Sequence, residues 1–262
     1  MPNLLLASVS VFIGGWIGSG ITMNSRLLMA AIAAVLAGAF GNIYNDIIDL
    51  PVDLKNVPKR PIPSGEVTVA QARILALATS SLAIIISIFL GLAGLSVVII
   101  AILALFVYSR YLKKTVWANL SISLIASMSF LLGGIVMKGT HYLTIVPLSI
   151  SYHFSRELIK DIIDIEGDKM YSSRSIPIIY GINRSKTIAI IAIVIFTLLL
   201  PLPYLFHTVS KFYLYISIIL VPFNIYIIKL IKEGNHQLPE ASRAFKFGML
   251  IAILAVVFGL IL

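Results

Sequence analysis

The segment NDIIDLPVD, from Asn45 to Asp53, directly follows a long apolar stretch and recurs 115 residues later as KDIIDIEGD, from Lys160 to Asp168. The two segments are identical at five of nine positions, and each is followed by a related tetrapeptide, RPIP from Arg60 and RSIP from Arg174. A cassette repeated in this way indicates an internal duplication. We therefore expect two pseudo-repeated helical bundles around a central cavity, with the two acidic segments facing each other.

The composition places these cassettes in a membrane protein. Of the 262 residues, 59% are hydrophobic and only 12% are charged, and the mean hydropathy is +1.02. Many apolar stretches reach the length of about 20 residues that a spanning helix needs. The sequence predicts an all-α integral membrane protein with one transmembrane domain over residues 1–262. Since the chain has no Cys, any metal must be held by oxygen or His ligands.

Hydropathy divides the chain into nine predicted spans. Their expected ranges are 4–22, 27–44, 70–91, 95–112, 117–137, 142–160, 187–207, 211–231 and 244–262.

The distribution of charge predicts how these spans cross the membrane. The connections after the second, fourth, sixth and eighth spans hold 17 of the 20 Lys and Arg residues. Because cytoplasmic loops are enriched in basic residues, we expect the N-terminus in the cytoplasm and the C-terminus outside. All 11 acidic residues lie on the same side, and nine of them belong to the two connections that contain the cassettes. Topology does not require this clustering of acids, so it indicates a function.

The spacing of the acids favours a metal site. Asp46, Asp49 and Asp53 are separated by three and four residues, as are the carboxylates of the second cassette, so each set shares one face of a helix. Such carboxylates repel one another and need either full solvation or a cation. Hard oxygen ligands suit Mg²⁺, which binds one or two carboxylates together with substrate phosphates. The alternative is that these acids only solvate the membrane surface. Pro51 and Gly167 are expected to end or bend the helices, which would leave Asp53 and Asp168 on loops.

The residues around the carboxylates resemble a known family. GNIYNDIIDLPVD from Gly41, followed by KRPIPSG from Lys59, resembles the first signature of the UbiA superfamily of membrane prenyltransferases, and Asp164 and Asp168 resemble its second motif, DxxxD. The longer segment Ser155–Asp168 is most similar to the archaeal branch of this superfamily, which makes digeranylgeranylglyceryl phosphate.

The resemblance implies nine helices, an isoprenyl diphosphate donor and Mg²⁺ as cofactor. Asp49, Asp164 and Asp168 are then expected to be catalytic. The expected metal ligands are Asn45, Asp46, Asp49, Asp53, Asp161, Asp164 and Asp168.

Basic residues beside the cassettes are candidates for binding the diphosphate, although each of them also fits a purely topological role. They are Arg60, Lys113, Lys169 and Arg174. Two further substrate contacts come only from the resemblance. Asn3 matches the Asn of an Arg-Pro-x-Asn element whose Arg is absent here, and Tyr108 matches the Tyr of a Tyr-x-x-x-Lys element that is one residue longer in this chain.

The archaeal resemblance implies that geranylgeranyl diphosphate is the donor and that the hydroxyl of geranylgeranylglyceryl phosphate is the acceptor. Arg156 is a candidate for the acceptor phosphate because a guanidinium binds phosphate through two hydrogen bonds, although an ion pair with Glu157 is equally compatible with its position. No residue stands out as the base for the acceptor, and His153 is expected to be structural. We expect the reaction at the cytoplasmic face of the cell membrane.

Other functions remain open at this stage. The acceptor could be an aromatic acid, a quinone precursor or haem, because the acidic clusters recognise only the donor. An ion transporter also carries intramembrane acids, but these usually lie within the spans rather than at one interface. Membrane lipids are the expected surroundings, with no nucleic acid and no obligate protein partner. The small residues of the first and fifth predicted spans predict close packing of helices, and they are Gly14, Gly15, Gly18, Gly20, Gly133 and Gly134.

Overall fold

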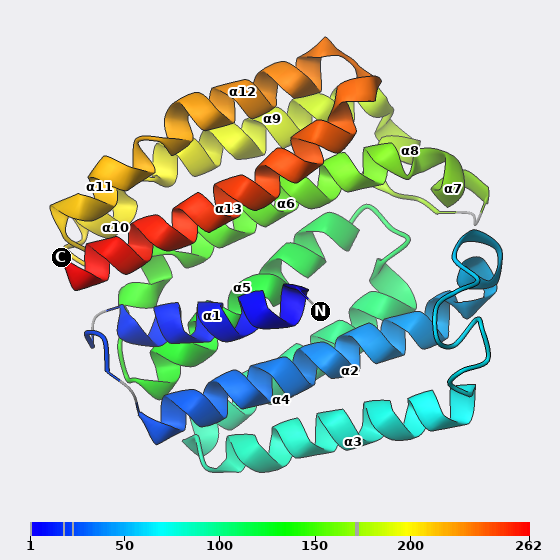
Figure 1. Cartoon of the computed structure of the whole chain (residues 1–262), viewed down its shortest axis with the longest axis horizontal. Helices are drawn as coiled ribbons and strands as arrows, with labels where there is room; N and C mark the ends of the chain where they lie inside the picture. Colours follow the sequence, from blue (N-terminus) through cyan, green and yellow to red (C-terminus); the bar gives the residue numbers. More distant parts are fainter. Residues whose placement is uncertain (1, 18, 23, 171–172) are drawn as a thin grey trace.

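The computed structural model describes residues 2–17, 19–22, 24–170 and 173–262, apart from the side chains of Pro2, Asn3 and Met170. The described part is all-helical and is shown in Figure 1. Its α-helices are α1 (Pro2–Trp16), α2 (Ser25–Asn56), α3 (Val69–Ile88), α4 (Gly91–Val107), α5 (Ala118–Val136), α6 (Val146–Ile163), α7 (Ile165–Met170), α8 (Ile176–Tyr180), α9 (Ile182–Leu199), α10 (Leu202–Leu205), α11 (Lys211–Ser217), α12 (Leu220–Glu233) and α13 (Leu238–Ile261). A π-helical turn, Tyr108–Leu112, continues α4, and the two short 3₁₀ helices are His141–Thr144 and Asn235–Gln237.

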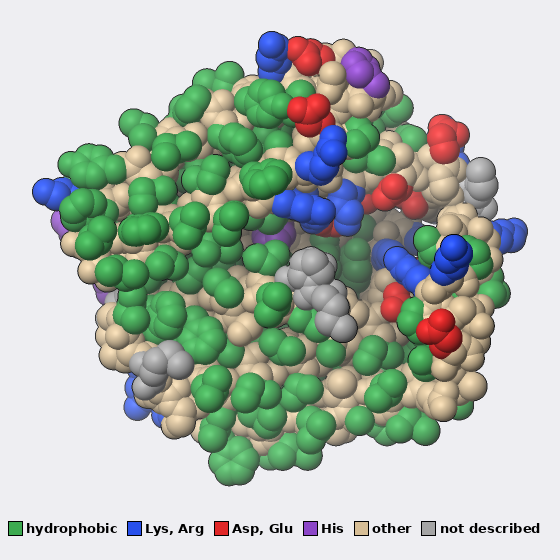
Figure 2. Space-filling model, in the orientation of Figure 1, with side chains coloured by type: hydrophobic (Ala, Val, Ile, Leu, Met, Phe, Trp, Pro, Cys, Tyr) green, Lys and Arg blue, Asp and Glu red, His purple; other side chains and the backbone are tan. Residues whose placement is uncertain are grey.

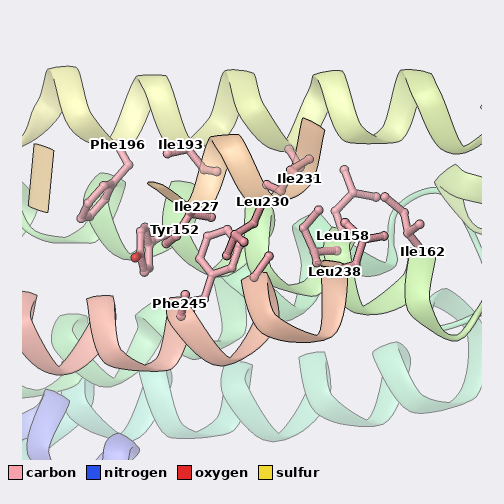
Figure 3. Packing of buried hydrophobic residues seen from close by; sticks show 14 of the residues in the cluster. Tyr152, Leu158, Ile162, Ile193, Phe196, Ile227, Leu230, Ile231, Leu238 and Phe245 are labelled. Atoms are coloured by element: carbon pink, nitrogen blue, oxygen red, sulfur yellow. The ribbon is translucent and has the colours of Figure 1, made fainter. Parts of the chain in front are cut away.

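Two bundles make up the molecule, as the repeated cassettes predict. In the first, α1 to α5 enclose a cluster of small and branched apolar side chains. In the second, α6, α9, α12 and α13 enclose the cluster shown in Figure 3, in which Tyr152 contacts the rings of Phe196 and Phe245. A third cluster joins the bundles and includes Ile13 of α1 and Tyr213 of α11. The fold class predicted from the sequence is therefore confirmed.

Seven helical segments are long and apolar enough to cross a membrane, counted over the residues that the structure describes. The other two expected spans correspond to α1, whose apolar part Leu4–Trp16 is shorter, and to α6, which carries four charged residues in its last two turns. Large apolar side chains such as Leu77, Leu92 and Leu198 lie exposed on the helices, and Figure 2 shows apolar side chains over much of the visible surface. A lipid environment makes this exposure favourable.

The helices that carry the acidic cassettes end differently from the prediction. Helix α2 continues through Pro51 to Asn56, so Asp53 is helical, and α7 includes both Gly167 and Asp168. The expectation that these two acids lie on loops is wrong. Pro51 removes only one backbone donor, and the backbone N–H of Val57 still reaches the carbonyl oxygen of Asp53 at 2.9 Å, so the last turn of α2 remains bonded.

Close contact between α1 and α5 depends on glycine. A methyl group added at Gly14 would lie 2.1 Å from the carbonyl oxygen of Phe130, and one added at Gly133 would lie 1.9 Å from the carbonyl oxygen of Val11. Neither backbone could accept a side chain there without moving. The predicted packing role is confirmed for Gly14 and Gly133, and it positions α1 against the central cavity. It is wrong for Gly20, where an added Cβ would meet nothing within 4 Å, and Gly18 lies outside the described residues.

Candidate functional site

A cavity of about 420 Å³ lies between the two bundles, bordered by α1, α2, α4, α5 and α6. Its wall has an apolar part and a polar part. Small and branched apolar residues, among them Ala34, Ala37, Ala101 and Leu105, line one part. The other part is polar, and its side chains are Asn45, Tyr108, Lys113, His153, Arg156, Glu157 and Lys160. Figure 2 shows acidic and basic side chains gathered around a hollow on this face. The cavity can therefore hold a molecule with a charged head and an apolar tail.

In the first acidic cluster, Asn45 of α2 lines the polar end of the cavity, whereas the carboxylates of the cluster lie on the last turns of α2 and outside the cavity wall. Asn45 donates a hydrogen bond through Nδ2 to Asp49 at 2.8 Å. Lys113, at the end of the π-helical turn after α4, donates through Nζ to Asn45 Oδ1 at 2.8 Å and also to the carboxylate of Asp49. One ammonium thus bridges two of the expected metal ligands.

Arg60 holds the other two acids of the first cluster. Its Nη1 donates to Asp53 at 2.7 Å and lies 3.4 Å from the carboxylate of Asp46. The side chain of Asp53 is only 8% exposed, whereas that of Arg60 is 47% exposed, so a partly solvated cation covers a buried carboxylate. This arrangement brings the tetrapeptide after the cassette back onto the helix.

The second cluster lies at the end of α6 and in α7. Asp161 accepts a hydrogen bond from Asn119 Nδ2 of α5 at 2.8 Å. Asp164 ends α6 and is exposed, and its carbonyl oxygen accepts from the backbone N–H of Asp168 at 3.0 Å. Partial burial raises the pKa of Asp168, and repulsion from Asp164 adds to this increase.

The two clusters face each other across the opening. The charges of Lys113 and Lys114 lower the pKa of Asp168, and that of Asp49 raises it, so residues of both clusters act on one carboxylate. The backbone N–H of Arg174 also donates to the carbonyl oxygen of Lys114 at 2.8 Å, which ties the segment after α7 to the loop after α4. Figure 1 shows α7 and the C-terminal end of α2 at the same end of the molecule.

Mg²⁺ fits the chemistry of this donor set. Among the described residues, no three Asp, Glu or His side chains already converge as a ready-made metal site. Instead, basic side chains occupy positions beside the carboxylates, at Asp49 and Asp53. Mg²⁺ usually takes only one or two carboxylates and completes its shell with phosphate oxygens and water, so convergence of three acids before substrate binds is not required.

On α6, a charged group faces the clusters from the other side of the cavity. Glu157 accepts from Arg156 through Oε1 and from Lys160 Nζ through Oε2 at 2.8 Å. The Nε of Arg156 is buried and has no hydrogen-bond partner within the described structure. Because all three side chains line the cavity, a bound anion would meet both cations there.

Four of the expected substrate-binding residues are not placed in the cavity wall, and one of them is Arg60, which lies on Asp53 instead. Lys169 is exposed and donates to Glu166 at 3.0 Å, and the side chain of Arg174 is exposed as well. The side chain of Asn3 lies outside the described part of the chain, although the neighbouring Leu4 lines the cavity. By contrast, Tyr108, Lys113 and Arg156 all line it.

Sequence reasoning missed two features of the site. The hydrogen bond between Asn119 and Asp161 depends on tertiary contact between α5 and α6, so no local sequence pattern predicts it. The place of Glu157 in the wall could have been found, because His153, Glu157 and Lys160 are spaced four and three residues apart on one face of a helix.

Known proteins resemble this chain over nearly its whole length. The model of the UbiA prenyltransferase family matches residues 7–258. A protein of Methanosphaera stadtmanae named digeranylgeranylglyceryl phosphate synthase is 32% identical, with 98% of this chain and 95% of the relative covered. A protein of Methanococcus maripaludis with the same name is 36% identical, with 99% and 95% covered.

Solved structures share the fold. A structure reported for the biosynthesis of digeranylgeranylglyceryl phosphate synthase in membranes superimposes with a TM-score of 0.85 at 29% identity, covering 99% of this chain and 95% of the other. A UbiA homolog from Archaeoglobus fulgidus bound to GPP and Mg²⁺ gives a TM-score of 0.73 at 17% identity, covering 98% and 97%. Because the family model matches residues 7–258 and a relative is 36% identical over nearly the full chain, the chain belongs to the UbiA prenyltransferase family.

Proposed function

We propose that the protein transfers the geranylgeranyl group of geranylgeranyl diphosphate to the hydroxyl of geranylgeranylglyceryl phosphate, with Mg²⁺ as cofactor. The product carries the second ether bond of an archaeal-type membrane lipid. The observation that carries this proposal is the cavity, whose polar end holds basic residues and acids beside an apolar chamber within the helices. The relatives named digeranylgeranylglyceryl phosphate synthase, which align over nearly the full chain, support the choice of acceptor.

The shape of the cavity matches the two chemical halves of the donor. A diphosphate head would lie near Lys113 and Asn45, and the isoprenoid tail would lie against Ala37, Ala101 and Leu105. Contact with these side chains keeps the tail out of water, which is favourable by about 25 cal/mol per Å² of apolar surface removed from water. The reacting carbon, which is bonded to the diphosphate, would therefore lie where the polar and apolar parts of the cavity meet.

Ionisation of the allylic carbon–oxygen bond requires stabilisation of the leaving pyrophosphate. Mg²⁺ would neutralise its charge, held by Asn45, Asp49, Asp164 and Asp168 with Asp46, Asp53 and Asp161 as further ligands or supporting groups. We assign Asp49, Asp164 and Asp168 as the catalytic members of this set. Lys113 and Arg60, which are paired with the carboxylates, would supply further positive charge to the diphosphate oxygens.

The remaining expected contacts are assigned by their positions. Tyr108 lines the cavity beside Lys113 and can donate its hydroxyl to the diphosphate. Lys169 and Arg174 lie near the second cluster but point into solvent, so they would contact the head group only after a shift of their side chains. Arg156 would bind the acceptor phosphate from α6, and Asn3 would contact substrate from the start of α1.

We place this site at the cytoplasmic face of the cell membrane. The support is the asymmetry of charge, because the loops at the same end as the acidic clusters hold most of the Lys and Arg residues. The C-terminus lies at the opposite end of the molecule from α7, as Figure 1 shows, which agrees with an outside location for it.

The purified full chain, reconstituted in lipid with Mg²⁺ and radiolabelled geranylgeranyl diphosphate, tests the proposal. The acceptors are geranylgeranylglyceryl phosphate, 4-hydroxybenzoate, a naphthoate and haem, each in a separate reaction. We expect a diether lipid with the first acceptor and no product with the others. Prenylation of an aromatic acceptor or of haem instead would overturn the proposed identity of the acceptor. If no reaction gave prenylation or release of pyrophosphate, the transferase function would be overturned.

A further inference from the structure

We propose that the carboxylate of Glu157 accepts the proton of the acceptor hydroxyl as the ether bond forms, with Arg156 and Lys160 holding it in place. This inference rests on the proposed function. In the reaction the bond between C1 of the donor and the diphosphate oxygen breaks, and pyrophosphate leaves with the electron pair. A bond then forms between C1 and the hydroxyl oxygen of the acceptor, and the hydroxyl proton passes to Glu157.

The position of Glu157 carries this assignment. It lines the same cavity as Lys113 and Asn45 but belongs to α6, on the wall opposite α2. In the proposed binding mode the reacting carbon lies at the border between the polar and apolar parts of the cavity, and Glu157 belongs to the polar wall. An acceptor whose phosphate binds Arg156 or Lys160 would bring its glycerol hydroxyl, only a few bonds away, beside the carboxylate between them.

The carboxylate of Glu157 is fixed by two hydrogen bonds and can still accept more. Each carboxylate oxygen accepts one hydrogen bond, Oε1 from Arg156 and Oε2 from Lys160 at 2.8 Å, and each oxygen has a second lone pair free for a hydroxyl. The side chain of Glu157 is 18% exposed, so it is fixed in place and still open to the cavity. A hydroxyl that has begun to bond a carbocation is strongly acidic, so a carboxylate is a sufficient acceptor for its proton.

The other acids of the site are less well placed for this role. Asp161, one turn further along α6, accepts from Asn119 and does not line the cavity. Asp49 is bonded to Lys113 and belongs to the side where the diphosphate would bind. His153 lines the cavity one turn before Glu157 and is the competing candidate, so the experiment must separate the two.

The test compares wild type with Glu157→Gln, which keeps an acceptor for Arg156 and Lys160 but loses the charge, and with Glu157→Asp, His153→Asn and the matched control Glu233→Gln. Glu233 is also a Glu paired with a Lys, at 3.6 Å from Lys229, but it lies at the end of α12 and away from the cavity. Each full-length variant is measured for single-turnover ether formation across pH, for affinity toward the acceptor, and for release of pyrophosphate when the acceptor is absent.

We expect Glu157→Gln to slow ether formation by about 10²- to 10⁴-fold, the usual loss when a general base is removed. At saturating Mg²⁺, wild type and His153→Asn should lose rate of ether formation at acid pH, and this dependence should be weaker in Glu157→Gln and return in Glu157→Asp. The charged and titratable groups around the carboxylate are His153, Arg156, Lys160 and Asp161 on its own helix and Tyr108, Lys113 and Asp49 on the elements packed against it. Release of pyrophosphate without acceptor should stay within about twofold of wild type.

Two results would overturn the assignment while leaving the proposed function intact. One is ether formation by Glu157→Gln at a rate close to that of wild type and Glu233→Gln. The other is an equal loss of ether formation and of acceptor-free pyrophosphate release, which would mean that Glu157 only supports the donor site. If wild type itself forms no ether, the proposed function is overturned and the assignment of Glu157 falls with it.

Discussion

Lys113 donates a hydrogen bond to the carboxylate of Asp49, a residue 64 positions earlier in the chain. The same ammonium also bonds Asn45, so a single side chain from the loop after α4 neutralises the part of the first cassette that faces the cavity. A cation is therefore already present where the family resemblance places a metal.

This contact predicts competition between Lys113 and Mg²⁺. In Lys113→Met, removal of the ammonium should increase the affinity for Mn²⁺, used as a spectroscopic substitute, by about threefold to tenfold when no diphosphate is present, which corresponds to roughly 1 kcal/mol. Turnover should nevertheless decrease, because the diphosphate loses one cation. Electron paramagnetic resonance measures the free Mn²⁺. Lys55→Met, at an exposed position in the last turn of α2, serves as the control and should bind Mn²⁺ like wild type.

Loss of the carboxylates that we assign as catalytic should abolish turnover but not folding. Asp49→Asn and Asp168→Asn each remove one charge from the site, and we expect pyrophosphate release to decrease by at least about 10³-fold. Both variants should still insert into membranes and elute as wild type does in size-exclusion chromatography, because neither side chain belongs to a hydrophobic cluster. Substantial activity in both would remove these residues from the metal site.

The raised pKa of Asp168 predicts an unusual pH dependence. Mg²⁺ binds the ionised carboxylate, so its affinity should weaken as the pH falls through this pKa, at a higher pH than for an ordinary Asp of pKa about 3.9. Without metal, the quantity that depends on pH is the stability of the fold, and it changes in the opposite direction. The fold disfavours the ionised form, so protonation as the pH falls should stabilise the metal-free protein.

The half-saturating Mg²⁺ concentration, measured at several pH values above the ordinary Asp pKa of about 3.9, checks this dependence. Thermal unfolding without Mg²⁺ at the same pH values checks whether the metal-free protein becomes more stable as the pH falls. In Asp168→Asn both dependences should become shallower. If the metal-free wild type lost stability on acidification over this range, the partial burial of Asp168 would not be the cause of the two pH dependences.

The all-helical fold and its two bundles could be predicted from the sequence. Each of them rests on local patterns, namely hydropathy, charge and the repeated acidic cassettes. The sequence did not predict that α2 continues through Pro51, since the cost of a missing backbone donor depends on whether the last turn is bonded elsewhere. It also could not show that Lys113 rather than Lys169 reaches the cavity. Both are basic residues beside the clusters, and only the packing of α2 against the turn after α4 distinguishes them.

The close approach of α1 and α5 predicts a strong effect of adding a side chain at Gly133. In Gly133→Val the new Cβ would lie 1.9 Å from the backbone oxygen of Val11, so the helices must separate. We expect a loss of at least about 3 kcal/mol in stability, at the upper end for overpacked sites. Gly139→Ala is the control, because its Cβ would meet the nearest atom at an ordinary 3.5 Å. Thermal unfolding in detergent should separate the two variants clearly.

The small residues of the apolar chamber predict a limit on donor length that can be changed. Ala101 lines the cavity from α4, away from the charged end. In Ala101→Phe, the added ring should occupy space needed by the far part of a C20 chain, and kcat/KM for geranylgeranyl diphosphate should decrease by about 10²-fold, equivalent to roughly 2.7 kcal/mol. The value for dimethylallyl diphosphate, a C5 donor, should change by less than about threefold, because its tail ends near the polar border.

Ala78→Phe, on the exposed face of α3, controls for the effect of a bulky residue on a membrane helix and should leave both donors unaffected. The decisive quantity is the ratio of kcat/KM for the two donors, because a general loss of folded protein lowers both values equally and leaves the ratio unchanged. If Ala101→Phe left the ratio at its wild-type value, the isoprenoid tail would have to lie elsewhere. The second, smaller pocket, which shares Leu6, Ser10 and His153 with the main cavity, would then be the next place to test by the same comparison of donors.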